Sequence, residues 1–231
     1  GDRSFTMRLN QFGDLTGDEF KYYVHGHDGS CMKKRTVEQR VNMIEETEAT
    51  PAPDSVDWTN VDGKSYVTPV KNQGQCGSCW AFSTTGSIES RSAIKNGWTG
   101  SQVISLSEQQ LVDCSQAEGN QGCNGGLMED GFKYIQKEGG LCTESEYPYT
   151  AKDGTCKASA CGKKYDPITG YKVVTKDSEP ALQAAVAEGP VSVSVDAAGS
   201  AWQFYHGGVV DSECGIVLDH GVLAVGYGTD P

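Results

Sequence analysis

The order of apolar and polar residues predicts helices in the first part of this chain. Residues 78–95 carry apolar positions at helical spacing, and a second helix is expected to start at Ser107. A third helix is predicted over residues 127–137. It should stop at Gly139-Gly140, because glycine readily adopts the left-handed conformation that ends a helix.

From about residue 168 onward the period becomes that of β-strands. Alternating and β-branched runs predict strands over residues 171–175, 191–195 and 222–225, and a short helix is predicted over residues 179–188. The chain is therefore expected to be an α+β protein with a helical lobe followed by a β lobe. A cleft between two such lobes is a natural place for a ligand.

A polar segment separates the beginning of the chain from the rest. Residues 45–53 contain two prolines and no apolar period, which is typical of an exposed linker where proteolysis occurs. Only one of the nine cysteines precedes this linker. We therefore divide the chain into residues 1–51, an N-terminal segment with the linker, and residues 52–231, the main domain.

Composition and charge narrow the class of protein. The 231 residues are 37% hydrophobic and carry a net charge of −12, without a basic stripe, which argues against nucleic acid as a partner. No apolar run approaches the length of a membrane span. Nine cysteines indicate an oxidising compartment with several disulfides, and the odd count leaves at least one sulfur for another purpose.

The stretch from Gln73 to Phe82 is the most informative part of the sequence. Cys79 follows a glycine-containing loop at the predicted start of a helix, where the helix dipole and free N–H groups favour the thiolate form. Its own N–H, together with the amide of Gln73, can donate hydrogen bonds to an oxyanion. Cys76 and Cys79 also permit a zinc half-site, a redox pair or two structural disulfide halves, although no second Cys-x-x-Cys and no βαβ pattern accompany them.

A nucleophilic cysteine requires a base, and His220 is the strongest candidate. It precedes a buried strand, so a rigid element would hold its imidazole in place. A structural role for this histidine is the alternative from the residues alone. His25 and His27 lie in a Gly/Asp-rich stretch and are predicted to be solvated, and His206 is predicted to lie in a surface turn.

Several motifs then point to one family. The Gln73–Phe82 stretch resembles the nucleophile region of papain-like cysteine proteases, and His220 lies 141 residues after Cys79, within the family's usual spacing. The resemblance spans residues 54–228 and is greatest to cathepsin-L-like members. The other matching motifs are Leu106–Cys114, Gly122–Gly126, Tyr147–Tyr149, Gly189–Val193, Asp219–Gly221 and Gly226–Gly228.

The N-terminal segment resembles the end of an inhibitory propeptide of the same family. Asn10, Phe12 and Asp14 reproduce its Asn-x-Phe-x-Asp core, whereas Arg8 replaces the small residue usual two positions earlier. The resemblance implies that residues 1–51 block the cleft as an intramolecular inhibitor. Cleavage near Glu48 to Pro53 would release the enzyme.

The resemblance implies a two-lobed papain-like fold. Its left lobe is helical, its right lobe is β-barrel-like, and the active-site cleft lies between them. The resemblance also assigns roles to individual residues. Cys79 is the expected nucleophile, His220 the general base and acid, and Gln73 an oxyanion donor. Gly125 and Gly126 are expected to pair with an extended substrate. A pocket for a bulky apolar residue at P2, the second residue before the scissile bond, is expected from Met128, Ser194, Leu218 and Gly221.

The cysteines sort by the same resemblance. The expected disulfides are Cys76–Cys123, Cys114–Cys156 and Cys142–Cys161. Cys79 is expected to stay free, Cys31 to leave with the propeptide, and Cys214 to lack the partner that family members carry later in their chains. The Asn and Trp that follow the histidine in the family would also lie beyond Pro231, so the right lobe is expected to be incomplete.

The sequence thus predicts a cysteine endopeptidase zymogen. Its expected partners are protein and peptide substrates, its own propeptide and cystatin-type inhibitors. The chain is expected to act as a monomer in a lysosome, a vacuole or outside the cell, with no metal, cofactor, nucleic acid or membrane. The alternative is a truncated, non-catalytic relative that binds peptides or proteases without cleaving them, and an exopeptidase is a weaker third reading.

Overall fold

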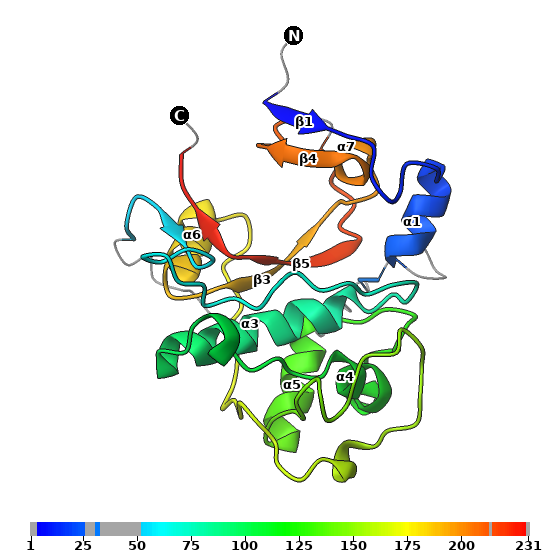
Figure 1. Cartoon of the computed structure of the whole chain (residues 1–231), viewed down its shortest axis with the longest axis vertical. Helices are drawn as coiled ribbons and strands as arrows, with labels where there is room; N and C mark the ends of the chain where they lie inside the picture. Colours follow the sequence, from blue (N-terminus) through cyan, green and yellow to red (C-terminus); the bar gives the residue numbers. More distant parts are fainter. Residues whose placement is uncertain (1–3, 26–30, 33–51, 213, 230–231) are drawn as a thin grey trace.

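The structure is a computed structural model, and it describes residues 4–25, 31–32, 52–212 and 214–229. Helices α3 (Cys79–Asn96), α4 (Glu108–Cys114) and α5 (Met128–Glu138) form the lower lobe in Figure 1. The predicted linker lies almost entirely outside the described residues. Short 3₁₀ helices occur at Gly100–Gln102, Gln116–Glu118 and Ala158–Ala160.

The three helices begin and end as their sequences predict. The hydroxyl of Ser107 accepts a hydrogen bond from the N–H of Gln110 (3.0 Å) and so caps α4. Helix α5 ends at Gly139, whose φ of 75° lies in the left-handed region, and Gly97 ends α3 in the same way with a φ of 69°.

Helix α3 is the centre of the helical lobe. Trp80 is fully buried on it, and Leu111 from α4 and Ile135 from α5 belong to the same apolar cluster. Truncation of a buried side chain as large as Trp80 costs about 3–5 kcal/mol of stability.

The upper lobe is built on an antiparallel pair of strands, β3 (Val191–Val195) and β5 (His220–Ala224), with Val195 opposite His220. Helix α6 (Glu179–Ala187) precedes β3 and is capped by Ser178. Strand β2 (Val56–Asp57) pairs with β6 (Gly226–Tyr227). The mixture of a helical and a β lobe confirms the predicted α+β class.

One predicted strand is wrong. Residues 171–175 form no strand, although their sequence is β-branched. A strand requires a backbone partner, and β3 pairs only with β5 among the described residues. The ring of Tyr171 instead stacks on Phe132 of α5, with centroids 5.6 Å apart.

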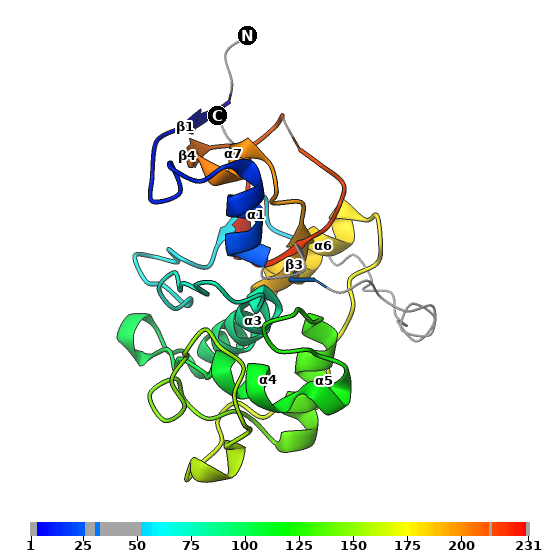
Figure 2. The same ribbon diagram turned by 90° about the vertical axis from the view of Figure 1, so that its right-hand side faces the viewer.

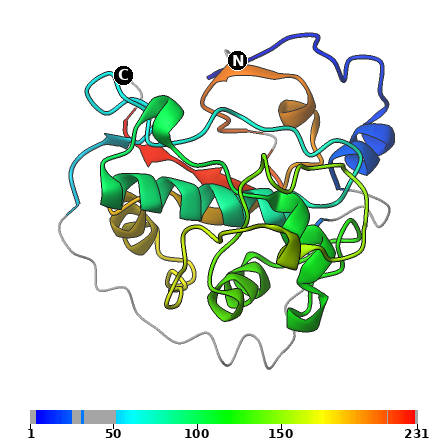
Figure 3. The same ribbon diagram turned by 60° about the horizontal axis from the view of Figure 1, so that its bottom comes forward.

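The lobes meet along α3 and β5, and small residues bring the two backbones close together. A methyl group at Gly86 would lie 3.0 Å from Leu223 of β5. The hydroxyl of Ser83 donates to the carbonyl of Val222 in β5 (2.7 Å). The hydroxyl of Ser192, on the neighbouring strand β3, donates to the backbone carbonyl of Ser83 (2.8 Å). In Figure 3 the strand runs alongside the helix. The N-terminus of α3 is therefore set against the start of β5.

The N-terminal segment docks on the upper lobe. Strand β1 (Phe5–Met7) pairs antiparallel with β4 (Tyr205–Gly208), which follows the short helix α7 (Ser200–Gln203). His206 therefore lies on an exposed strand rather than in a turn. Helix α1 (Gly17–His25) lies between α7 and the N-terminal end of α3 (Figures 1 and 2).

The motif around Asn10 makes this docking specific. Asn10 donates to the carbonyl of Gln203 (2.7 Å), and the buried Gln203 amide donates to the carbonyls of Phe12 (3.0 Å) and Leu15 (2.9 Å). The ring of Phe12 packs edge-on against Phe20 of α1. Reciprocal hydrogen bonds of this kind fix the path of the segment.

A buried ionic cluster lies inside the helical lobe. Lys71 contacts Glu89 (2.7 Å) and Glu108 (2.6 Å), and both carboxylates are almost fully buried. Burial raises the pKa of Glu89 and Glu108, and the attraction of Lys71 only partly offsets it. Burial alone would lower the pKa of Lys71, but the two carboxylates outweigh it and raise that pKa.

This cluster predicts that the helical lobe is more stable in acid. A carboxyl whose pKa is higher in the folded form binds more protons folded than unfolded, so stability falls as pH rises above the unfolded value of 4.5. We expect Glu108→Gln to flatten this fall in the pH range above 4.5. Denaturant midpoints across that range measure it. The exposed Asp54→Asn is the control, and an unchanged slope in Glu108→Gln would contradict the assignment.

Candidate active site

Cys79 occupies the first position of α3, as the sequence predicts. Gly74 turns the preceding loop with a φ of 58°, and the N–H of Gly77 donates to the carbonyl of Cys123 (2.9 Å). The N–H of Gly221, at the start of β5, donates to Sγ of Cys79 (3.1 Å). The sulfur therefore lies where the two lobes meet, close to the positive end of a helix.

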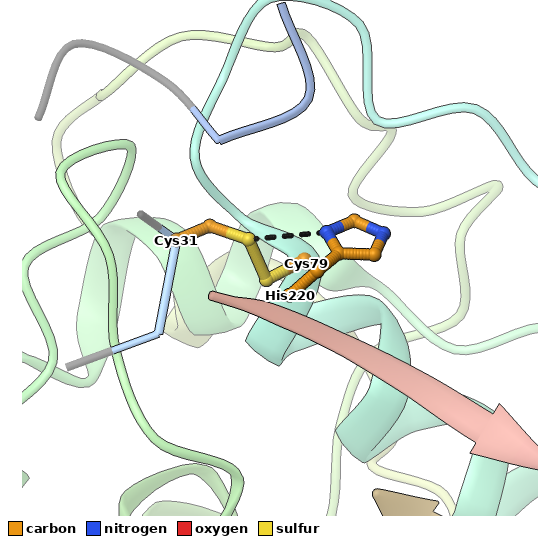
Figure 4. Close-up of side chains that lie close together, drawn as sticks. All are labelled: Cys31, Cys79 and His220. Carbon is orange, nitrogen blue, oxygen red and sulfur yellow. Dashed lines mark hydrogen bonds between the residues drawn. A yellow bond between two sulfur atoms is a disulfide. The ribbon is translucent and has the colours of Figure 1, made fainter. Parts of the chain in front are cut away.

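The sulfur of Cys79 is not free, which corrects the sequence-based expectation. It forms a disulfide with Cys31 of the N-terminal segment (Figure 4). Sequence reasoning missed this bond because the resemblance placed Cys31 in a segment to be removed. The three predicted disulfides left Cys31, Cys79 and Cys214 over, so a fourth pair was open, but the count does not say which two of these sulfurs meet.

His220 lies beside this disulfide. Its Nδ1 is 3.4 Å from Sγ of Cys31, and a ligand atom from each of Cys31, Cys79 and His220 lies within 4.8 Å of the others. These three residues could bind a metal ion only if both cysteines were thiolates, and in the disulfide neither cysteine is a thiolate. The geometry thus brings together the sulfur and the imidazole that the sequence singled out.

The imidazole of His220 is held in its neutral form. Burial, and after it the nearby His25, lower its pKa to about 4 against the opposing effect of Asp219. The two rings are 5.6 Å apart. His25 was predicted to be solvated, and that prediction is wrong: it is 1% exposed, and its Nε2 lies 3.4 Å from Oδ1 of Asp219.

Gln73 points its amide toward the N-terminal segment. Its Nε2 donates to the carbonyl of Val24 (2.6 Å) and to that of Cys76 (3.0 Å). The carbonyl oxygen of His25, the last residue of α1, lies close to Gly77, since a methyl group on Gly77 would be 2.7 Å from that oxygen. The end of α1 therefore brings its carbonyls against the loop that precedes α3.

Gly126 pairs with the N-terminal segment through its backbone. Its N–H donates to the carbonyl of Cys31 (3.1 Å), in a parallel bridge between Met32 and Gly126. Only glycine fits at Gly126, because a methyl group there would lie 2.7 Å from the ring of Trp80. The carbonyl of the neighbouring Gly125 accepts from the N–H of Gln121 instead.

Met32 fills the space where the apolar pocket was predicted. A methyl group at Gly221 would lie 3.0 Å from the sulfur of Met32 and 3.3 Å from that of Met128, so both side chains contact this glycine. Ser194 is opposite Gly221 in the strand pair. Leu218 is 56% exposed, so three of the four predicted residues gather here and the fourth is largely exposed.

The remaining cysteines pair as the resemblance implied. The disulfides are Cys76–Cys123, Cys114–Cys156 and Cys142–Cys161. Cys214 is an exposed free cysteine. Among the described helices, none has the length and apolar character needed to cross a bilayer.

Comparison with known proteins identifies the class that this fold and site define. Residues 52–231 match the family described as papain family cysteine protease. The chain belongs to this family.

Its relatives include mouse procathepsin L, 46% identical over 99% of this chain and 65% of the relative, and rice oryzain beta chain, 46% identical over 98% and 46%. The solved structure of digestive procathepsin L 3 from Tenebrio molitor larval midgut aligns with a TM-score of 0.82 and 39% identity, over 98% of this chain and 69% of that one. The chain thus spans about half to two thirds of the length of these curated relatives.

The environment of His220 predicts that acid loosens the N-terminal segment. Opening would expose the ring and return its pKa toward 6.5, so the closed form binds fewer protons between about pH 6.5 and 4 and loses stability as pH falls through that range. We expect amide hydrogen exchange of residues 4–25, corrected for its intrinsic pH dependence, to accelerate there. His220→Gln should remove part of the effect, and an identical profile in that variant would contradict this prediction.

Proposed function

We propose that this chain is the proform of a cysteine endopeptidase in which Cys79 is the nucleophile and His220 the general base and acid. The observation that carries the proposal is the meeting of two elements. The N-terminus of α3 brings Cys79, and the start of β5 brings His220, to the same point between the lobes. Membership of the papain family supports the same reaction class.

The reaction begins once the sulfur of Cys79 carries a proton or a charge rather than a bond to Cys31. The neutral imidazole of His220 takes the thiol proton, and the thiolate is stabilised by the start of α3 and the N–H of Gly221. The thiolate attacks the carbonyl carbon of a peptide bond and forms a tetrahedral oxyanion. The N–H of Cys79 and the amide of Gln73 donate to that oxyanion.

Collapse of this intermediate releases the first product. The imidazolium of His220 gives its proton to the leaving amine, and an acyl group remains on Cys79. Water then attacks the thioester, with His220 as base, and the carboxylic acid product leaves. Regeneration of the Cys79 thiol completes the cycle.

We propose that the N-terminal segment inhibits by using the groups that a substrate would use. Gln73 binds the carbonyl of Val24, Gly126 binds that of Cys31, and the side chain of Met32 packs on Gly221, as that of Met128 does. Substrate cannot enter while these donors and this pocket are occupied. The proposed boundary after residue 51 would separate the inhibitor from the enzyme, and the family match that begins at residue 52 supports it.

The disulfides and the expected response to acid indicate the compartment in which the protein acts. Disulfides, acid-stable helical packing and acid-loosened docking fit a lysosome, a vacuole or the extracellular space, where we propose that the protein acts. Its proposed substrates are proteins and peptides, and cystatin-type inhibitors and a monomeric state are part of this proposal. A KDEL-tailed cysteine endopeptidase from Arabidopsis thaliana, 45% identical, is among the relatives.

Labelling tests the nucleophile. After reduction and removal of residues 1–51, an epoxide thiol reagent should modify Cys79, and Cys79→Ser should abolish both labelling and peptidase activity. His220→Ala should lower kcat/KM by on the order of 10⁴-fold or more, since it removes the base. His206→Ala is the matched control on an exposed strand. Labelling that persists in Cys79→Ser would show that Cys79 is not the nucleophile. Near-full activity of His220→Ala would show that His220 is not the base.

Substrate series test the proposed P2 preference. Met32 in the pocket predicts that activated enzyme prefers Phe or Leu over Arg at P2, because an unpaired charge beside Met128 and Gly221 would be desolvated. Met128→Glu should shift kcat/KM toward Arg by about tenfold or more, and Met128→Leu should not. If Met128→Glu left the Phe-to-Arg ratio unchanged, Met128 would not line the pocket.

A further inference from the structure

The bond between Cys31 and Cys79 does more than place the N-terminal segment in the cleft. Occupancy by a peptide is reversible, whereas a disulfide removes the nucleophile chemically. We propose that Cys31 is a covalent redox latch: it holds the proform inactive until a thiol reductant frees Cys79, independently of cleavage in the chain. This inference rests on the proposed role of Cys79 as the nucleophile.

The backbone delivers Cys31 to this position by contacts that do not involve its sulfur. Gly126 binds the carbonyl of Cys31, and Gln73 binds the carbonyl of Val24, seven residues earlier in the segment. Met32, the next residue, is anchored beside Met128. The Cα atoms of Cys31 and Cys79 are 5.9 Å apart, within the range that a disulfide spans.

Cleavage alone would not release a latched inhibitor. The predicted linker at residues 45–53 lies after Cys31, so a chain cut there would still carry the N-terminal segment on the sulfur of Cys79. The product would be two chains joined by one disulfide. Reduction alone, in turn, would leave an intact chain whose segment still occupies Gly126 and the pocket. Full activation therefore requires both events.

The chemistry of the site gives this disulfide a better leaving thiolate than the other three, although both of its sulfurs are buried. The thiolate of a reductant attacks Sγ of Cys31, the S–S bond breaks, and Cys79 leaves as a thiolate. The N–H of Gly221 already donates to the sulfur of Cys79, which lies at the start of α3 and within 4.8 Å of His220, so the leaving thiolate is stabilised and departs faster. The other three pairs have no such group beside either sulfur among the interactions of the described residues.

A second thiol completes the exchange. It attacks the mixed disulfide on Cys31, releases the Cys31 thiol and forms the oxidised reductant. Two thiols are oxidised to one disulfide, and the Cys31–Cys79 bond takes up the two electrons and two protons. Both sulfurs are buried, Cys31 at 0% and Cys79 at 1% exposed, so a small thiol has better access than a protein dithiol unless the segment first opens.

Peptide mapping tests the latch without relying on activity. The full chain is isolated with its free thiols blocked, digested without reductant and analysed by mass spectrometry. The expected result is a linked peptide pair containing Cys31 and Cys79, with Cys214 alone carrying the blocking group. Blocked Cys79 in otherwise oxidised protein, or a Cys31–Cys214 pair, would overturn the proposal.

Graded reduction tests its lability and its consequence. With dithiothreitol raised stepwise, Cys79 should become alkylated before any cysteine of the other three disulfides. Cys31→Ser should be alkylated at Cys79 without reductant, and Cys214→Ser should still require it. Release of Cys79 by a chelator instead of by dithiothreitol would show metal ligation and overturn the latch.

The two proposals fail in different ways. If Cys31 and Cys79 are linked but the reduced and cleaved protein hydrolyses no peptide, the proposed peptidase function fails and the linkage stands. If Cys79 is free in the isolated proform and the cleaved protein is active without reductant, the protease stands and the latch is wrong. After cleavage in the linker, a non-reducing gel should retain the N-terminal fragment on wild type and lose it from Cys31→Ser.

Discussion

The contact between α3 and β5 is the constraint on which the rest of the molecule depends. Gly86 lets the helix approach Leu223 closely, and the hydroxyl of Ser83 ties α3 to β5 by donating to the carbonyl of Val222. The hydroxyl of Ser192, on the neighbouring strand β3, donates to the carbonyl of Ser83 and ties that strand to α3 as well. A helix start and a strand start are thereby held at one point. Cys79 and His220 come from positions far apart in the chain, and the close packing of α3 against β5 keeps the two side chains near each other.

Acid is expected to change the stability of the helical lobe and the stability of the closed cleft in opposite directions. The buried carboxyls of Glu89 and Glu108 favour the folded helical lobe in acid. The buried imidazole of His220 disfavours the closed cleft in acid. One change in pH can therefore loosen the N-terminal segment while the lobe that carries Cys79 becomes more stable.

The N-terminal segment is attached at two levels. Strand pairing with β4 and the hydrogen bonds of Gln203 fix it to the upper lobe at a distance from the reacting groups. Carbonyls of Val24 and Cys31, and the side chain of Met32, then occupy the cleft itself. The distant contacts set the path of the chain, and that path determines which sulfur arrives at Cys79.

Local sequence by itself predicted the helices and their ends, and the family resemblance pointed to the two residues that the structure brings together at the lobe boundary. Ser107 and Gly139 act within a few residues of themselves, so their effects are readable without a fold, and the cysteine and histidine motifs carry their chemistry locally. Only the tertiary structure decided that residues 171–175 form no strand, that His25 is buried and that Cys79 is bonded to Cys31. Each of these depends on which distant segment lies opposite, and neither periodicity nor local chemistry contains that information.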